Sequence, residues 1–248
     1  MDWASVIGLA LALAGLFVGH AIDGGKFASL VQPAAFAIVV IGTAGAVLLQ
    51  TEAPTFVRGI KMLRWVFRPP PNQRQKFARD IINWSQTARR DGLLALEGQM
   101  NRATDKFVQK GLRLMIDGIH PDKLRNLLET EISAYEFSQR QGARIWESAA
   151  GYSPTIGIIG AVLGLIHVME NLSDPARLGA GIAVAFVSTV YGVGLANLFF
   201  YPVGNKLKSI VAETVAQYDI LLEVFYDLAS GDHSRVIDER VASLLARD

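Results

Sequence analysis

The sequence predicts an all-α, polytopic membrane protein with four transmembrane helices and a helical cytoplasmic domain. Hydrophobic residues make up 51% of the 248-residue chain and charged residues only 19%, whereas a soluble globular domain carries about 25% charged residues. Four long apolar stretches contain no Asp, Glu, Lys or Arg. The charges gather outside these stretches, in segments where apolar residues recur at helical spacing.

The four apolar stretches are long enough to cross a bilayer, because a helix needs about 20 apolar residues to span its hydrocarbon core. Span one is predicted over Trp3–Ile22 and span two over Pro33–Gln50. Spans three and four are predicted over 149–169 and 178–203. The first stretch is long and has no basic region before it, so we interpret it as a retained span and not as a cleaved leader.

Lys and Arg are distributed unevenly around the spans, which predicts their orientation. The first hairpin holds only Lys26 and the second only Arg177, whereas residues 51–148 hold 17 such residues. We therefore expect both termini and the long loop in the cytoplasm, with the two hairpins outside. The expected domains are 1–50 for spans one and two, 51–148 for the cytoplasmic loop, 149–203 for spans three and four, and 204–248 for C-terminal cytoplasmic helices.

Residues 56–67 predict an amphipathic helix, with Arg58, Lys61 and Arg64 on one side. Such a helix would lie along anionic lipid headgroups. It could equally be a simple basic flank of span two, and both interpretations place it at the membrane. Pro69, Pro70 and Pro71 then end it.

Apolar stripes at helical spacing predict that the rest of the cytoplasmic portion is helical as well. Gly92 is expected to cap one of these helices, and no alternating strand pattern is present. Helices are predicted over 73–90, 93–100 and 105–116, from Pro121 nearly unbroken into span three, over 205–228, and after Gly231.

Several classes of function are excluded or disfavoured by what the sequence lacks. Without cysteine there are no disulfides, thiolate nucleophiles or Cys-bound metals. No nucleophile–base spacing or glycine-rich phosphate loop is present, so we expect no enzyme activity, cofactor or metal. Basic residues are balanced by acids along the same helices, which argues against nucleic-acid binding. The four histidines are scattered: His20, His120, His167 and His233.

Spans three and four carry small residues at spacings of three and four, which lets helices approach closely in lipid. They include Gly157, Gly160 and Gly164 in span three, with Ser188 and Gly192 in span four. Neither span contains the carboxylate that an ion usually needs at the membrane midplane. The chain is therefore either an inert scaffold or half of an ion pathway whose acid comes from another chain.

Three segments resemble the MotA/PomA family of flagellar motor stator subunits, within the MotA/TolQ/ExbB superfamily. They are residues 151–169, which read GYSPTIGIIGAVLGLIHVM, the loop segment 89–97, which reads RRDGLLALE, and span four with Thr189 and Pro202. The order of two spans, a long loop, two spans and a charged tail also matches. The resemblance covers essentially the whole chain.

The resemblance implies a homopentamer in the bacterial inner membrane that surrounds two copies of a MotB-like, single-span partner. That partner would supply the ion-binding Asp and bind peptidoglycan. Ion flow would turn the pentamer, and the cytoplasmic loop would drive the switch complex of the flagellar rotor.

The resemblance also implies roles for individual residues. Thr189 matches a hydroxyl near the ion path, although a Thr in a helix commonly bonds its own backbone one turn back. Pro154 and Pro202 match prolines at the cytoplasmic ends of spans three and four; Pro202 could also be an ordinary helix-end proline. Sodium-type members carry a second threonine in span three, where this chain has Ala161 between Gly160 and Val162. We therefore expect proton coupling.

Arg89 and Glu97 match charges proposed to contact the rotor, and the adjacent Arg90 could share this role. The alternative interpretation of these charges is an ordinary solvated helix face.

Two other functions remain open from the sequence. An ExbB/TolQ-like energising subunit would resemble spans three and four, but such proteins usually have three spans and an outer N-terminus, unlike the hairpin over residues 3–50. A non-conducting membrane scaffold is the other, and an inert Thr189→Ala variant would favour it.

Overall fold

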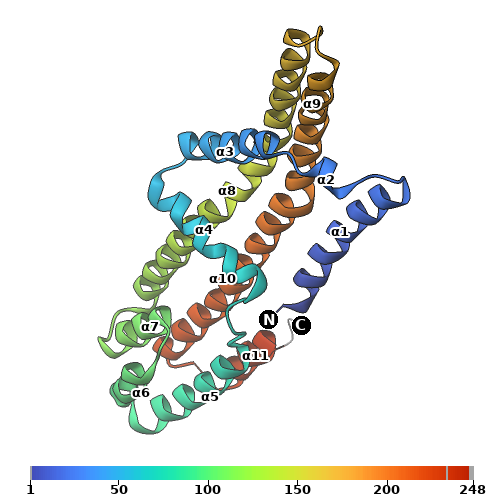
Figure 1. The fold of residues 1–248 in the computed structure, drawn as a ribbon. Coiled ribbons are helices and arrows are strands. Elements are labelled where there is room, and N and C mark those ends of the chain that lie inside the picture. Colours follow the sequence, from blue (N-terminus) through green and yellow to red (C-terminus); the bar gives the residue numbers. More distant parts are fainter. Residues whose placement is uncertain (1, 233, 246–248) are drawn as a thin grey trace. The chain divides into compact units, whose positions relative to one another are not determined.

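The computed structural model describes residues 2–232 and 234–245 of the chain. His233, one of the scattered histidines, and the side chain of Arg177 lie outside this description. Every regular element in the described part is helical (Figure 1), as the sequence predicts. Helices suit a membrane because each satisfies its backbone hydrogen bonds within one segment.

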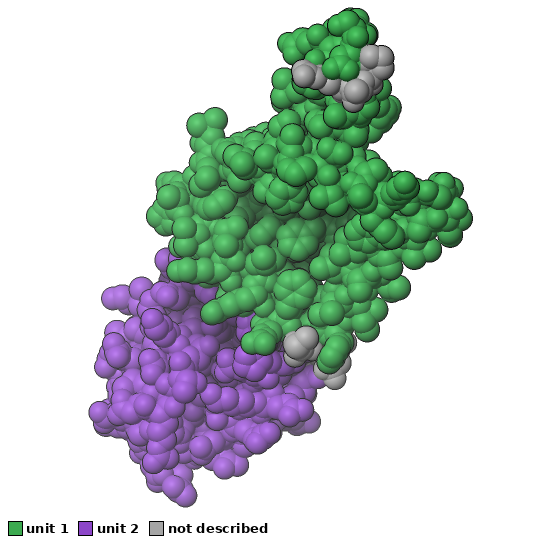
Figure 2. All heavy atoms as spheres, in the orientation of Figure 1, with its two compact units in different colours: residues 1–69, 139–209 green, residues 70–138, 210–248 purple. Residues whose placement is uncertain are grey.

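The chain folds into two compact units, which are coloured separately in Figure 2. Unit 1 comprises residues 1–69 and 139–209, and unit 2 comprises residues 70–138 and 210–248. Each unit therefore joins two stretches that are far apart in the sequence.

Unit 1 contains the apolar helices. Four helices of the described chain are long and apolar enough to cross a membrane, as predicted. The bounds of α1 (Trp3–Ile22) and α3 (Pro33–Gln50) coincide with the predicted spans one and two. The unit also holds α2 (Phe27–Leu30), a short helix that the sequence did not predict. Its other elements are α4 (Ala53–Phe67), the later part of α8 (Pro121–Glu170), α9 (Pro175–Leu195), η2 (Ala196–Phe200) and the first part of α10 (Tyr201–Ser230).

The N-terminal end of α1 is tied to the rest of unit 1 by Asp2. Its carboxylate caps the helix by accepting hydrogen bonds from the backbone N–H groups of Ala4 and Ser5, at 3.1 and 3.4 Å. The same side chain pairs with Lys206 of α10, and the Asp2 N–H donates to the carbonyl of Phe67 at 2.9 Å. No residue of α1 is buried, so these contacts of Asp2 help to hold an otherwise exposed helix in place.

The helix that contains span four does not end at Pro202. The helical backbone continues from α9 through η2, a π-helical segment, into α10, which runs to Ser230. Proline lacks a backbone N–H and its ring displaces the carbonyl four residues earlier, here that of Leu198. A π-helical turn directly before Pro202 absorbs this clash without ending the helix. The interpretation of Pro202 as an ordinary helix-end proline is therefore wrong.

Unit 2 is a helical domain around one apolar core. Its helices confirm the predicted stripes, because Ile81, Trp84, Leu128 and Phe225 are all buried in that core, and the rings of Trp84 and Phe225 stack at 5.7 Å. The elements are α5 (Arg74–Asp91), η1 (Leu93–Leu96), α6 (Glu97–Arg102), α7 (Lys106–Ile116), α11 (Ser234–Leu245), and the remaining parts of α8 and α10.

Candidate functional site

The paired helices α8 and α9 form the centre of unit 1 and lie side by side in Figure 1. Their backbones touch through glycines. A Cβ added to Gly164 would lie 2.7 Å from the backbone nitrogen of Ala185, and one added to Gly192 would lie 2.6 Å from the Ser153 carbonyl oxygen. The Ser153 hydroxyl also donates to the Gly192 carbonyl at 3.0 Å. The small-residue stripes therefore pack the two spans of this chain against each other.

This contact accounts for the glycines of span three. Gly157, Gly160 and Gly164 are buried and face α9. A surface along which a partner could slide would have to use the other, exposed sides of these helices.

Thr189 and Ser188 are adjacent in α9 but have different surroundings. Ser188 is fully buried, and its hydroxyl donates to the Val184 carbonyl at 2.7 Å. Thr189 is only half-buried, and its hydroxyl donates no hydrogen bond to any residue that the structure describes. The back-bond expected of an ordinary helical hydroxyl is thus made by Ser188, and the Thr189 hydroxyl is available for another ligand.

Ala161 lies at the same level of the helix pair as Thr189. The structure packs their chain neighbours together, because a Cβ on Gly160 would lie 2.7 Å from the Ser188 hydroxyl oxygen. Ala161 is half-buried and contributes only a methyl group. At this level Thr189 therefore offers a hydroxyl and Ala161, from span three, offers none.

The two prolines lie in different places. Pro154 lies inside the unbroken α8, and a Cβ on Gly192, one turn after Thr189, would lie 3.3 Å from its Cα atom. The structure therefore places Pro154 beside α9 at Gly192, one helical turn from Thr189. Pro202 instead lines an apolar cavity of about 310 Å³ together with Leu9 of α1 and Phe199 of η2.

The predicted rotor-contact charges all lie in unit 2, around the end of α5. Arg90 is 81% exposed and forms an ion pair with Asp91 at 2.8 Å, and this hydrogen bond lowers the pKa of the Asp91 carboxyl. Glu97, the first residue of α6, is exposed. Both side chains can be reached from solvent.

Arg89 has a different environment from its neighbour. Its guanidinium donates to the Asp232 carbonyl at 3.1 Å, across a groove of about 500 Å³ that Gly92 and Gly231 also line. It therefore holds the turn between α10 and α11. The sequence offered only Gly231 as a sign of this turn, and nothing that linked it to Arg89.

No group of three or more His, Asp or Glu side chains that could hold a metal ion occurs in the described part of the chain. The predicted spans contribute hydroxyls and backbone but no carboxylate. Spans three and four, within α8 and α9, can therefore form a wall of an ion path, but they lack the charged group that would bind the ion.

Comparisons with known proteins agree with this description. Residues 99–220 match the MotA/TolQ/ExbB proton channel family. The chain is 34% identical to Motility protein A of Cereibacter sphaeroides, with 100% of this chain and 96% of that protein covered. It is 32% identical to Motility protein A of Bacillus subtilis (strain 168), with 99% and 91% covered.

Two solved structures share the fold. The structure of C. jejuni MotAB matches with a TM-score of 0.93 at 28% identity, covering 100% of this chain and 97% of that chain. The flagellar MotAB stator complex from Bacillus subtilis matches with a TM-score of 0.87 at 31% identity, covering 98% and 96%.

Four helices long and apolar enough to cross a membrane, together with these matches, define a multi-pass membrane protein of a channel family and not an enzyme. The chain belongs to the MotA/TolQ/ExbB proton channel family. Its function within that family is that of a flagellar motor stator subunit of the MotA type.

Proposed function

We propose that this chain forms, with a MotB-like single-span partner, a stator that couples proton flow across the bacterial inner membrane to torque on the flagellar rotor. The observation that carries the proposal is the absence of any carboxylate from the spans. The ion-binding Asp must then come from the partner. The resemblance of this chain to the MotA chains of MotAB complexes supports the pairing.

We propose a homopentamer of this chain around two copies of the partner, which binds peptidoglycan. The exposed sides of α8 and α9 carry large apolar side chains such as Ile159, Leu163 and Phe186. These surfaces suit other membrane helices or lipid. Residues 1–50 and 149–203 would hold the spans, with 51–148, 204–248 and both termini in the cytoplasm.

The ion path would follow the exposed flank of the α8–α9 pair. Thr189 would offer its hydroxyl to the proton or its hydrating water, and Pro154 would shape α8 beside it. Ala161 supplies no second oxygen, and sodium needs several oxygen ligands while a proton can move along water to one carboxylate. Pro202 would act further along, through the π-helical segment before it.

The cytoplasmic unit would contact the switch complex of the rotor through Arg90 and Glu97, which are exposed. Arg89 would act by positioning, because it holds the turn before α11. The energy available is about 2.3 kcal/mol for each elementary charge that crosses 100 mV, and relative motion of the two proteins would convert it into torque.

The test is to express the chain together with the single-span protein encoded beside it, in a flagellated strain without stators. Swimming is measured with and without a protonophore. We expect restored swimming that the protonophore abolishes. Thr189→Ala should lower proton flux roughly fivefold, as expected for the loss of one hydrogen bond of about 1 kcal/mol, and Thr189→Ser should retain it.

The charge reversals Arg90→Glu and Glu97→Arg test the rotor contact separately, since they should reduce torque without reducing proton flux. Absence of swimming although both proteins reach the membrane would contradict the proposal. An unchanged Thr189→Ala variant would favour a non-conducting scaffold, and proton flux without rotation in any motor would favour an ExbB/TolQ-like role.

A further inference from the structure

Helix α4 is seated in unit 1 by direct contact with α8. Gly59, Met62 and Val66 form its buried face. A Cβ on Gly59 would lie 2.4 Å from the Gly142 carbonyl oxygen, and the Trp146 indole N–H donates to the Gly59 carbonyl at 3.0 Å. The position and rotation of α4 against α8 are therefore well defined.

Two different faces of α4 remain outside this contact. At about 100° per residue, Lys61 and Arg64 lie on one flank of the buried face, together with Arg58 and Arg68. Ile60, which is 46% exposed, lies on the opposite flank with Phe56, Leu63 and Phe67. A helix with one basic and one apolar exposed face is suited to the boundary between headgroups and hydrocarbon.

The contacts with α8 also give the level of α4 relative to the membrane. Gly142 and Trp146, which contact Gly59, precede the predicted start of span three at Ala149 by seven and three residues. At 1.5 Å per residue this is about 4–10 Å outside the hydrocarbon core. The headgroup layer on each side of a bilayer is about 5–7 Å thick, so the Trp146 end of this contact lies within it and the Gly142 end just outside it.

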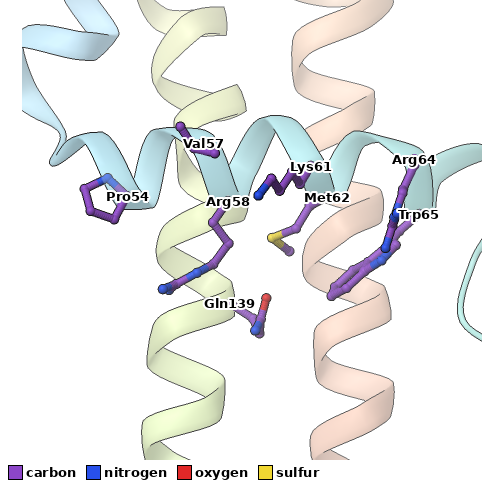
Figure 3. Close-up of a pocket in the computed structure, with 8 residues that line it drawn as sticks. All are labelled: Pro54, Val57, Arg58, Lys61, Met62, Arg64, Trp65 and Gln139. Atoms are coloured by element: carbon purple, nitrogen blue, oxygen red, sulfur yellow. The ribbon is translucent and has the colours of Figure 1, made fainter.

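A cavity of about 370 Å³ opens on the basic side of α4. It is lined by Lys61, Arg64 and Trp65, with Arg58 and with Gln139 from α8. Figure 3 shows Arg58 and Trp65 extending on the same side of α4 as Gln139. The side chains of Lys61 and Arg64 are exposed, and Trp is the residue type enriched at membrane interfaces.

We propose that this cavity binds the phosphate of an anionic phospholipid headgroup. Arg64 offers a forked donor to phosphate oxygens and Lys61 a compact positive charge, and the Gln139 amide can add a neutral hydrogen bond. The occupant is a bilayer lipid because α4 lies along the outer part of the headgroup layer, and Arg64 adjoins the apolar face that would contact acyl chains. The proposal rests on Lys61 and Arg64 and is independent of the proposed motor function.

Trp65 provides a direct probe of the occupant. The full-length chain is co-expressed with its proposed partner, purified, and reconstituted into vesicles of equal parts phosphatidylcholine and phosphatidylglycerol. Bromine is carried on the acyl chains of one lipid or the other. The Trp65 signal is the difference in fluorescence between the wild type and Trp65→Phe, and its quenching reports which lipid lies beside α4.

We expect brominated phosphatidylglycerol to quench Trp65 more than brominated phosphatidylcholine in the wild type. One basic side chain near an anionic surface changes lipid association by roughly fivefold, so Lys61→Gln/Arg64→Gln should remove the preference. Lys106→Gln/Lys123→Gln, which removes the same charge from unit 2, should keep it. Added salt should weaken the wild-type preference.

Three results would overturn the proposal. Equal quenching by both lipids in the wild type would show that the cavity does not select an anionic headgroup. A preference that survives Lys61→Gln/Arg64→Gln would place the selective site elsewhere. Quenching by neither lipid would show that protein covers α4 in the assembled complex.

Discussion

Glycine, which has a hydrogen where alanine has a methyl group, decides how closely spans three and four approach. Around Gly164 the nearest atoms to an added Cβ are all backbone atoms of α9, at 2.7 to 2.9 Å. Backbone cannot rotate away as a side chain can, so the helices would have to separate. The same is true of Gly192, whose added Cβ would meet the backbone of α8.

We therefore expect Gly164→Ala to destabilise the protein although alanine favours helix more than glycine does. Overpacking costs about 1–3 kcal/mol, which corresponds to a lower thermal midpoint by roughly 2–4 °C for each kcal/mol. The midpoint is measured on detergent-solubilised protein. The control Gly45→Ala, where nothing lies within 4 Å of the new Cβ, should leave the midpoint unchanged or raise it; equal midpoints for both variants would refute the close-contact argument.

At this scale the sequence predicts which residue types matter but not which way they face. The sequence alone does not distinguish the environments of the adjacent Ser188 and Thr189, because composition does not separate neighbouring helical positions. The structure separates them, since only the buried Ser188 bonds the preceding turn. That difference depends on the rotation of α9 against α8, and no pattern in one span specifies it.

Element boundaries depend on local signals that the sequence does contain. Asp2 before α1, Pro33 at the start of α3 and Asp105 before α7 begin helices, and Gly92 ends α5 with a φ of 83°. These boundaries could be predicted because capping side chains, proline and positive-φ glycine act within a few residues. The π-helical η2 could not, because apolar spacing does not distinguish it from an α-helix.

Asp105 connects the start of α7 to α10. One carboxylate oxygen accepts from the N–H groups of Phe107 and Val108, at 2.8 and 3.3 Å. The other accepts from the Tyr218 hydroxyl at 3.1 Å. Burial raises the pKa of Tyr218 well above its ordinary value, so this phenol stays protonated and remains a donor at neutral pH.

Asp105→Ala should loosen the first turn of α7, because it removes the cap and leaves Tyr218 without its acceptor. Loss of an N-cap costs about 1 kcal/mol, so amide hydrogen exchange at the start of α7 should accelerate roughly fivefold. Mass spectrometry of peptides covering residues 105–112 measures this. Asp105→Asn keeps a capping oxygen and should exchange nearly as slowly as the wild type; equally fast exchange in both variants would show that charge, and not capping, matters.

For the whole molecule, the four apolar helices and the asymmetry of Lys and Arg predict the path of the chain through the membrane. The number of spans needs only hydropathy and length, which is why the sequence predicts it well. The division into two units depends on contacts between distant segments, such as residues 1–69 with 139–209. Linear patterns contain no such pairing, so the units could not be derived from them.

The predicted orientation can be tested cleanly because the chain has no cysteine. Ser29→Cys lies in the first hairpin and Ser230→Cys at the end of α10, and both positions are exposed. A membrane-impermeant maleimide added to spheroplasts should label Ser29→Cys within minutes, and Ser230→Cys only after the membrane is permeabilised. The reverse order of labelling would contradict cytoplasmic termini.

The sparse attachment of α1 bears on how the protein responds to bilayer thickness. Its 20 residues extend about 30 Å, which matches the average hydrocarbon layer. A helix that buries none of its residues and is held mainly at the Asp2 end can tilt to match a thinner bilayer. The closely packed α8 and α9 can tilt only together, because tilting one against the other would break their backbone contacts. Hydrophobic mismatch would then be absorbed at the periphery of the subunit, and the helix pair beside Thr189 would keep its geometry as lipid composition changes.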